Sequence, residues 1–367
     1  MTIHLEIIRL TSKDEGINTN RNKKEIEIGL NFILSHLEEP TIFPRTIMTK
    51  KLGYQRIVYS KERALEHFIE SDFIDCRINA FPALKEGATW IPELLFIDLD
   101  LSNFNTKKSL QIALDKTLRN IKEKLANNNV HPTVLWSGNG YHIILPVYCP
   151  VELERIQDFQ EFDNPSERFL RFAKDNLSNN KADKANNPSF RACLLRIPYS
   201  LNGKCLARGE SLDNSKVKII QEWDKKRPSI EHLLRSFRRN LINEKIKNDL
   251  KFKKYNQKTH GKFSNEIKEI KWIEKLLQTP IADYRKNTVS LILAPYLINI
   301  KNLSYSISFE IINEWLSKCN SFKPLDQRFD DRVKRSLKIA IEKKIPPMKL
   351  DTLRERNLDL YKIMKIK

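Results

Sequence analysis

The spacing of apolar and polar positions along the chain changes near residue 255. Before that point, short apolar runs are bounded by polar or turn residues, which is typical of β-strands. The runs that predict strands are residues 94–97, 133–136, 142–145 and 194–197. Segments with helical spacing lie between them, at about residues 25–38, 62–70, 107–126, 165–177 and 229–246. This mixture predicts an α+β or α/β domain built round at least one central sheet.

After Gly261 the strand pattern ends and helical periodicity is left. The segments that predict helices are residues 267–277, 289–297, 307–316 and 333–341. We expect Pro295 to kink its helix or to mark its last turn. Four helices in so short a stretch predict a small bundle, in which Trp272, Tyr296 and Trp315 are core residues.

The charge of the chain is strongly unbalanced. It has 65 Lys and Arg against 46 Asp and Glu in 367 residues, a formal net charge of +19. Such an excess is typical of proteins that bind a polyanion, nucleic acid above all. Residues 225–254 form either a solvated helix and linker or a surface that contacts nucleic acid. The candidate nucleic-acid contacts, including two in the bundle, are Arg235, Arg238, Arg239, Arg285 and Lys286.

Two classes of protein are disfavoured by the composition. No stretch approaches the ~18–20 uninterrupted apolar residues of a membrane helix, and Met1 to Arg9 lack a signal-peptide pattern. We therefore expect a soluble, cytoplasmic protein with no membrane partner. The five cysteines are scattered, with no C-x-x-C pair and no His at ligand spacing. This favours reduced, packed thiols and no structural zinc.

The first candidate site is a pair of carboxylates at the end of an apolar strand. Asp98 and Asp100 are two residues apart, so in a strand they project from the same face. Neighbouring carboxylates repel each other unless a cation lies between them, and oxygen ligands suit Mg²⁺ or Mn²⁺. The alternative is a strand that runs into an Asp-capped turn.

The second candidate site is a turn in a chain that has little glycine. Gly138 and Gly140 are two of only 9 glycines, and they stand between two apolar runs. Glycines permit positive φ and bring backbone N–H groups close to a ligand. Ser137 and His142 flank the turn, where their side chains can converge on a phosphate. The alternative is an ordinary tight turn with a His at the start of a strand.

The third candidate site combines an acid with a basic strand and turn. Its members, in chain order, are Asp183, Arg191, Arg196, Asn202 and Lys204. Cations close to paired carboxylates fit a negatively charged substrate held between them and a metal. Simple solvation is the alternative for each cation, and Asp163 and Asp175 are alternatives for the acid.

Together, the three segments resemble the three motifs of the archaeo-eukaryotic primase superfamily. These are a strand ending in D-x-D, then S-G-x-G-x-H, then a later acid followed by an Arg-rich strand. The chain is similar to primase–polymerases of archaeal plasmids and viruses, which carry an R-x-P-x-S/T-x-N-x-K-like stretch, here Arg196 to Lys204. The resemblance covers residues 75–210, and residues 272–337 look like the helical domain that accompanies such cores.

The resemblance implies an α+β protein with a mixed-sheet, RRM-like catalytic core and an all-α C-terminal bundle. It implies a primase–polymerase catalytic domain at 1–224, a basic helix or linker at 225–262, the bundle at 263–345 and a basic tail at 346–367. The bundle would bind the template and the initiating nucleotides.

The implied activity is de novo primer synthesis on single-stranded DNA, with primer extension, by two-metal nucleotidyl transfer. Asp98, Asp100 and Asp183 would hold two Mg²⁺ or Mn²⁺ ions. The implied nucleotide contacts are Ser137, Gly138, Gly140, His142, Arg191, Arg196, Asn202 and Lys204. The implied partners are a single-stranded DNA template, ATP or other NTPs, and dNTPs. A separate replicative helicase is a further candidate partner, because the chain has no G-x-x-x-x-G-K-[ST] motif.

Two other functions are compatible with parts of the sequence. A non-catalytic replication or origin-binding protein with a primase-like fold explains the charge of +19. It does not explain why three acids stand where positive charge would help DNA binding most. A glycosyltransferase with Asp98 and Asp100 as its D-x-D motif predicts sugar-nucleotide turnover and no salt-sensitive DNA affinity.

Overall fold

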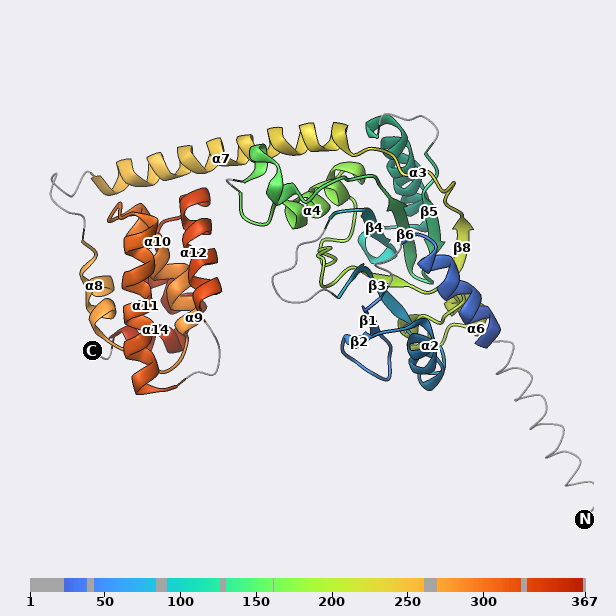
Figure 1. Ribbon diagram of the computed structural model, residues 1–367, viewed down its shortest axis with the longest axis horizontal. Helices are drawn as coiled ribbons and strands as arrows, with labels where there is room; N and C mark the ends of the chain where they lie inside the picture. Colours follow the sequence, from blue (N-terminus) through green and yellow to red (C-terminus); the bar gives the residue numbers. More distant parts are fainter. Residues whose placement is uncertain are drawn as a thin grey trace, which may run out of the picture. The chain divides into compact units, whose positions relative to one another are not determined.

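The chain forms two compact units in a computed structural model (Figure 1). The structure describes residues 23–37, 43–83, 91–125, 130–160, 162–260, 269–324 and 329–365. The first unit comprises Met1–Gln157 and Asn164–Phe237, and the second comprises Asp158–Asp163 and Arg238–Lys367. Within the described part of the chain, no helix has the length and apolar character that a membrane-spanning segment needs.

The first unit contains two four-stranded sheets. One sheet has the order β2-β1-β3-β7, with strands Arg56–Val58, Arg45–Met48, Arg77–Pro82 and Leu194–Arg196. The other has the order β4-β6-β5-β8, with strands Leu94–Asp100, Gly140–Pro146, Thr133–Trp136 and Lys218–Gln221. The predicted α+β class is confirmed.

The pairing within the sheets differs from the expected mixed sheet. Every strand pair in the described sheets is antiparallel. β5 and β6 are joined by the short Gly138-containing turn, and a turn of that length can only connect antiparallel strands. Among the described residues, parallel pairing is limited to the isolated bridges Ile74–Leu201 and Tyr148–Ser229.

Helices of the first unit cover these sheets. They are a helix at 23–34, α2 (Lys61–Glu70), α3 (Lys107–Lys124), α4 (Pro165–Leu177), α5 (Gly203–Ala207) and α6 (Leu212–Ser215). α3 and α4 both contact β4, the strand that ends in Asp98 and Asp100. α3 begins at a reciprocal cap, in which the side chains of Thr106 and Ser109 each accept a hydrogen bond from the other's backbone N–H. The acid-bearing strand is thus contacted by a helix whose first turn is well capped.

The long helix α7 (Glu231–His260) runs from the first unit into the second, which is otherwise a helical bundle. The bundle elements are α8 (Lys271–Gln278), α9 (Arg285–Thr288), a π-helical segment η4 (Val289–Leu293), α10 (Ala294–Asn299), α11 (Tyr305–Phe322), α12 (Asp330–Lys343), α13 (Leu350–Arg356) and α14 (Leu358–Lys365). Tyr296 and Trp315 are buried in its core and Trp272 packs against it, which confirms the predicted core. Pro295 lies in the first turn of α10, directly after η4.

The segment expected to be a basic tail is folded. Residues 346–367 include α13 and α14, and their Leu353 and Leu360 are buried in the bundle core. Its 22 residues include six Lys or Arg against three Asp or Glu, so its charge indicated a tail. In the structure most of its apolar residues pack on the bundle core, whereas Leu358 is exposed.

Candidate active site

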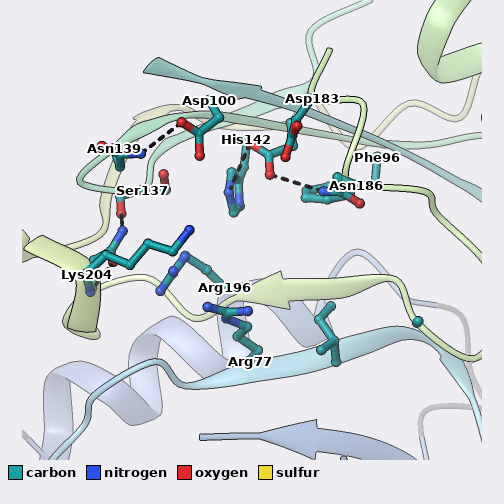
Figure 2. Close-up of a pocket in the computed structure, with 14 residues that line it drawn as sticks. Arg77, Phe96, Asp100, Ser137, Asn139, His142, Asp183, Asn186, Arg196 and Lys204 are labelled. Atoms are coloured by element: carbon teal, nitrogen blue, oxygen red, sulfur yellow. Dashed lines mark hydrogen bonds and ion pairs between the residues drawn. The ribbon is translucent and has the colours of Figure 1, made fainter. Parts of the chain in front are cut away.

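A cavity of about 300 Å³ is lined by residues from both sheets of the first unit (Figure 2). Its charged and polar lining residues are Arg77, Asp98, Asp100, Ser137, Asn139, His142, Asp183, Asn186, Arg196, Asn202 and Lys204. In Figure 2, Asp100 and Asp183 lie along one side of the cavity, and Arg77, Arg196 and Lys204 lie along the opposite side. The cavity therefore has an acidic wall and a basic wall.

The acidic wall begins with the strand spacing that the sequence predicted. In β4, Asp98 and Asp100 are partly exposed to the cavity, while Leu99 between them is buried. The antiparallel partner β6 places His142 opposite Asp98 and Gly140 opposite Asp100. Both carboxylates thus lie on one face of the strand, next to the glycine turn.

Asp183 reaches the same wall from a loop that follows α4. Its backbone N–H donates a 2.8 Å hydrogen bond to the carbonyl oxygen of Asp98. The buried ammonium group of Lys174 donates to the carbonyl oxygens of Asp183 and Asn186, at 3.1 and 2.8 Å. The Asn186 amide then donates to Asp98 Oδ2 at 3.1 Å. Lys174 and Asn186 therefore fix the loop against the acid-bearing strand.

The two alternative acids do not line the cavity. Asp163 belongs to the second unit, where its carboxylate lies 3.6 Å from the guanidinium of Arg335. Asp175 lies 3.4 Å from Lys174 Nζ. Of the three candidates, only Asp183 is beside Asp98 and Asp100.

The surroundings of Asp98 change its acidity. Burial raises the pKa of the Asp98 carboxyl to about 6, and the negative charges of Asp100 and Asp183 add to this effect. The hydrogen bond from Asn186 and the positive charge of Arg196 oppose it. A buried carboxylate with like charges beside it is poised to gain a cation.

The donor atoms of this wall suit a hard divalent ion. Protein donors occupy one oxygen of each carboxylate: Asp98 Oδ2, Asp100 Oδ1 and Asp183 Oδ1. Among the described residues, no hydrogen bond reaches the second oxygen of Asp100 or Asp183. Carboxylate oxygens are the ligands that Mg²⁺ and Mn²⁺ prefer.

The side chains are not gathered round a single point. Over the residues that the structure describes, no three Asp, Glu, His or Cys side chains are arranged to hold one ion together. Binding of an ion by all three acids would require their carboxylates to turn toward a common centre.

The glycine turn lies at the end of the acidic wall. Gly138 has φ +86°, in the left-handed region that favours glycine. Gly140 packs so closely on the carbonyl oxygen of Leu99 that a Cβ atom there would clash. Asn139, between the two glycines, donates a 2.9 Å hydrogen bond to Asp100 Oδ1. Both glycines are therefore needed to bring the turn against the acid-bearing strand.

His142 is a buried, neutral side chain at the centre of the cavity. Its Nε2 lies 3.6 Å from Asp98 Oδ1. Burial, and then the charges of Arg196 and Arg77, hold its pKa well below the usual value. Its Nδ1 is buried and has no hydrogen-bond partner among the described residues. A neutral imidazole can donate one hydrogen bond and accept one.

The basic wall is built from two arginines on neighbouring strands. Arg77 of β3 and Arg196 of β7 are directly opposite each other in the sheet. Asp75 Oδ1 accepts hydrogen bonds from both, at 3.3 Å from Arg77 Nη2 and 2.8 Å from Arg196 Nη1. Burial, and then the charge of Arg196, lower the pKa of Arg77. Like charges opposite each other destabilise a sheet, and one carboxylate cannot neutralise two guanidinium groups, so this wall favours an anion.

Asn202 joins the basic wall to the glycine turn. Its side-chain amide donates to the carbonyl oxygen of Ser137 at 2.6 Å, and its Oδ1 accepts from the backbone N–H of Lys204 at 3.0 Å. The second bond caps α5. The Lys204 side chain extends from this cap into the cavity (Figure 2).

A protein-family match covers part of the second unit. Residues 268–367 match the Primase X family. The matched region begins just before α8 and includes the bundle helices through α14. The match supports a primase-related family for this chain. No curated protein sequence matches it.

Most of the site residues predicted from the sequence lie together. Those that line the cavity are Asp98, Asp100, Ser137, His142, Asp183, Arg196, Asn202 and Lys204. Gly138 and Gly140 form the adjoining turn. Arg191 is exposed and is not among the lining residues, because the chain turns at residues 190–191 before β7 begins.

Sequence reasoning missed three lining residues that orient or complete the two walls: Arg77, Asn139 and Asn186. Arg77 could have been found as the one charged residue of the mostly apolar run Arg77–Pro82. Asn139 lies between the two glycines of the turn, and the sequence pattern did not mark it as a site residue. No sequence signal marked Asn186, because its role depends on how its loop meets β4.

The surface cations expected to contact nucleic acid lie in different settings. Arg235 and Arg238 are exposed, and each forms an ion pair, with Glu231 at 2.6 Å and Asp158 at 3.0 Å. Arg239 and Lys286 are also exposed.

Arg285, in the Primase X-like region, is not available to nucleic acid, so that prediction is wrong. Its side chain is buried, at 2% exposure. Its guanidinium donates to the carbonyl oxygens of Ile281 and Lys323, at 3.0 and 2.5 Å, and to Asn320 Oδ1 at 2.7 Å. Lys323 is the C-cap of α11, so Arg285 satisfies acceptors at the end of a helix inside the bundle.

Proposed function

We propose that this cavity is the active site of a DNA primase–polymerase. It makes primers de novo on a single-stranded DNA template from NTPs or dNTPs, and it extends them. The observation that carries the proposal is the facing of an acidic wall and a basic wall across one cavity of about 300 Å³. A nucleoside triphosphate with its metal ions has the matching distribution of charge. The Primase X match in the second unit supports a primase-related role.

The acidic wall would hold the metal ions. Asp98, Asp100 and Asp183 supply carboxylate oxygens for two Mg²⁺ or Mn²⁺ ions. When bound, such ions activate the attacking hydroxyl and neutralise the leaving pyrophosphate. Asn186 and Asn139 orient the carboxylates through their hydrogen bonds to Asp98 and Asp100.

The basic wall would hold the triphosphate. Arg77, Arg196 and Lys204 neutralise its charge from the side opposite to the acids. Arg77 and Arg196 are oriented by Asp75 before the substrate arrives. His142, which is neutral, donates a hydrogen bond without adding charge. The glycine turn, of which Ser137 and Asn139 line the cavity, approaches the phosphates from its end.

A non-catalytic DNA-binding protein is the competing function. It has no use for three acids gathered on one wall of the cavity, because each acid weakens attraction to phosphates. A catalytic protein needs that arrangement to gather metal ions. The acidic wall therefore favours catalysis.

The test is a primer-synthesis assay. The full chain is incubated with single-stranded DNA, labelled ATP, and NTPs or dNTPs, with Mg²⁺ or Mn²⁺. We expect products with the wild type and none with the Asp98→Ala/Asp100→Ala variant, which should bind the template nearly as well. The control is Asp115→Ala, on the exposed side of α3. Products from the double variant would refute the metal assignment, and a wild type that shifts DNA without consuming nucleotides would favour the binding protein.

A further inference from the structure

The edge of the first sheet carries an exposed cluster of aromatic and basic side chains. This edge patch consists of Lys50, Lys51, Tyr54, Arg56, Ile57 and Tyr59. Its two tyrosines are 59% and 76% exposed. Residues 46–60 contain no Asp or Glu, and among the described residues the three cations form no ion pair. An unpaired basic surface with exposed rings is suited to a polyanion that also has flat faces.

The patch is held in place by the sheet and by a neighbouring turn. The backbone N–H groups of Lys50 and Lys51 donate to the carbonyl oxygen of Ile74 and to Ser71 Oγ, at 3.1 and 3.2 Å. The N–H of Gly53 donates to the carbonyl oxygen of Thr49 at 3.1 Å. The loop is therefore positioned before any ligand binds, which lowers the entropic cost of binding.

The patch is continuous with the basic wall of the cavity. Across the sheet, Arg196 of β7 is opposite Arg77 of β3, which is opposite Met48 of β1. Thr46, two residues before Met48, shares its face and is opposite Ile57 of β2. This face of the sheet therefore leads from the basic wall to Ile57 at the edge patch, over about 14 Å at the usual spacing of strands, whereas Arg56 is opposite Ile47 and belongs to the other face.

We propose that the edge patch binds the single-stranded template next to the active site. Tyr54 and Tyr59 stack on template bases, and Lys50 and Lys51 contact the backbone phosphates. Proteins that bind single strands combine the same two elements, aromatic platforms and a basic path along the backbone. The proposal rests on the proposed function where it calls the bound strand a template.

The experiment measures binding of a fluorescein-labelled single-stranded oligodeoxynucleotide to the full chain by anisotropy, without nucleotides. Tyr54→Ala/Tyr59→Ala should weaken binding at least about 30-fold, in line with the loss of stacking on two bases. Tyr54→Phe/Tyr59→Phe should bind like the wild type, because a phenyl ring still stacks. The control is Tyr148→Ala, which removes a ring that is 57% exposed elsewhere on the first unit.

Salt dependence tests the cations separately. Lys50→Ala/Lys51→Ala should reduce the magnitude of the slope of log affinity against log salt concentration by about 1.4. Each lost contact between a lysine and a phosphate of a single strand reduces this slope by about 0.7. Lys116→Ala/Arg119→Ala removes the same charge from the exposed side of α3 and should leave the slope unchanged. Equal slopes for both double variants would overturn the assignment of the lysines to backbone phosphates.

The outcomes separate this proposal from the proposed function. Tyr54→Ala/Tyr59→Ala is compared with the wild type at an unchanged melting temperature. If the variant then binds single strands as tightly as the wild type, the edge-patch proposal is refuted, whether or not the protein makes primers. An equal loss of affinity for duplex DNA would also refute the single-strand assignment. If the wild type makes no primers but the tyrosine variant loses single-strand affinity, the proposed function fails and the patch stands. If the double alanine variant does not fold, the single variant Tyr59→Ala takes its place. An affinity of Tyr59→Ala for single strands equal to that of the wild type would refute the edge-patch proposal.

Discussion

The buried carboxyl of Asp98 gives the sharpest prediction of this structure. Its pKa of about 6, against an ordinary 3.8, reflects a cost of ionisation in the folded, metal-free protein. A difference of about 2 units corresponds to about 3 kcal/mol of unfolding free energy. Asp98→Asn removes that charge and keeps the shape, because its amide oxygen can still accept from Asn186 and its amide can donate to neutral His142. The variant should therefore be about 2–3 kcal/mol more stable than the wild type at pH 7 in EDTA.

The sign of the pH dependence follows from the direction of the shift. A carboxyl with a raised pKa in the folded state binds its proton more tightly there than in the unfolded chain. Its contribution to stability is therefore greatest below about pH 4, and is lost as the pH rises to about 6. The stability difference between Asp98→Asn and the wild type should appear over this interval and stay constant above it.

The assay is urea unfolding at a series of pH values, in EDTA and then with Mn²⁺. Mn²⁺ should stabilise the wild type and not Asp98→Asn, because ligand binding to the folded state alone raises its stability. Asp115→Asn, on the exposed side of α3, is the matched control and should show neither effect. Equal or lower stability of Asp98→Asn at pH 7 in EDTA would refute the argument that the acidic wall is electrostatically strained.

Three further predictions concern the basic wall, the glycine turn and the bundle. Arg196→Gln should weaken nucleoside triphosphate binding at least about tenfold in calorimetry, through loss of a charged hydrogen bond; unchanged affinity would contradict the basic wall. Gly140→Ala should cost about 1–3 kcal/mol in urea unfolding, because its Cβ meets the Leu99 carbonyl; a neutral effect would contradict that close approach. Arg285→Met should destabilise the second unit by about 2–4 kcal/mol, because three acceptors lose their donor, whereas Lys286→Ala should not change its melting.

The acidic wall was largely predictable because its chemistry is local. Asp98 and Asp100 follow an apolar strand at a spacing of two, so the period of a strand alone puts them on one face. The turn beside them was predictable for a similar reason, since Gly138 and Gly140 stand out in a chain with few glycines. The predicted helix 165–177 is α4 as observed, whereas the helix predicted at 229–246 continues to His260 as α7.

The basic wall was only half predictable, because it depends on pairing between distant strands. Arg77 and Arg196 become neighbours only when β3 pairs with β7, and Asp75 becomes their common partner for the same reason. For Arg285, the sequence predicted a surface contact that the structure does not have. It stands next to Lys286 in a polar stretch that looks exposed, and only the tertiary structure shows the acceptors at the end of α11 that bury it.

The most direct test of the central claim is whether the template dictates the product. The full chain should be given homopolymeric single-stranded templates in turn, with all four nucleotides and Mn²⁺, and the incorporated bases identified. We predict that each template directs incorporation of its complement, and that Asp98→Asn/Asp100→Asn makes no product while still binding the strand. Incorporation that ignores the template, or no incorporation with any template, would contradict a template-directed nucleotidyltransferase in this cavity.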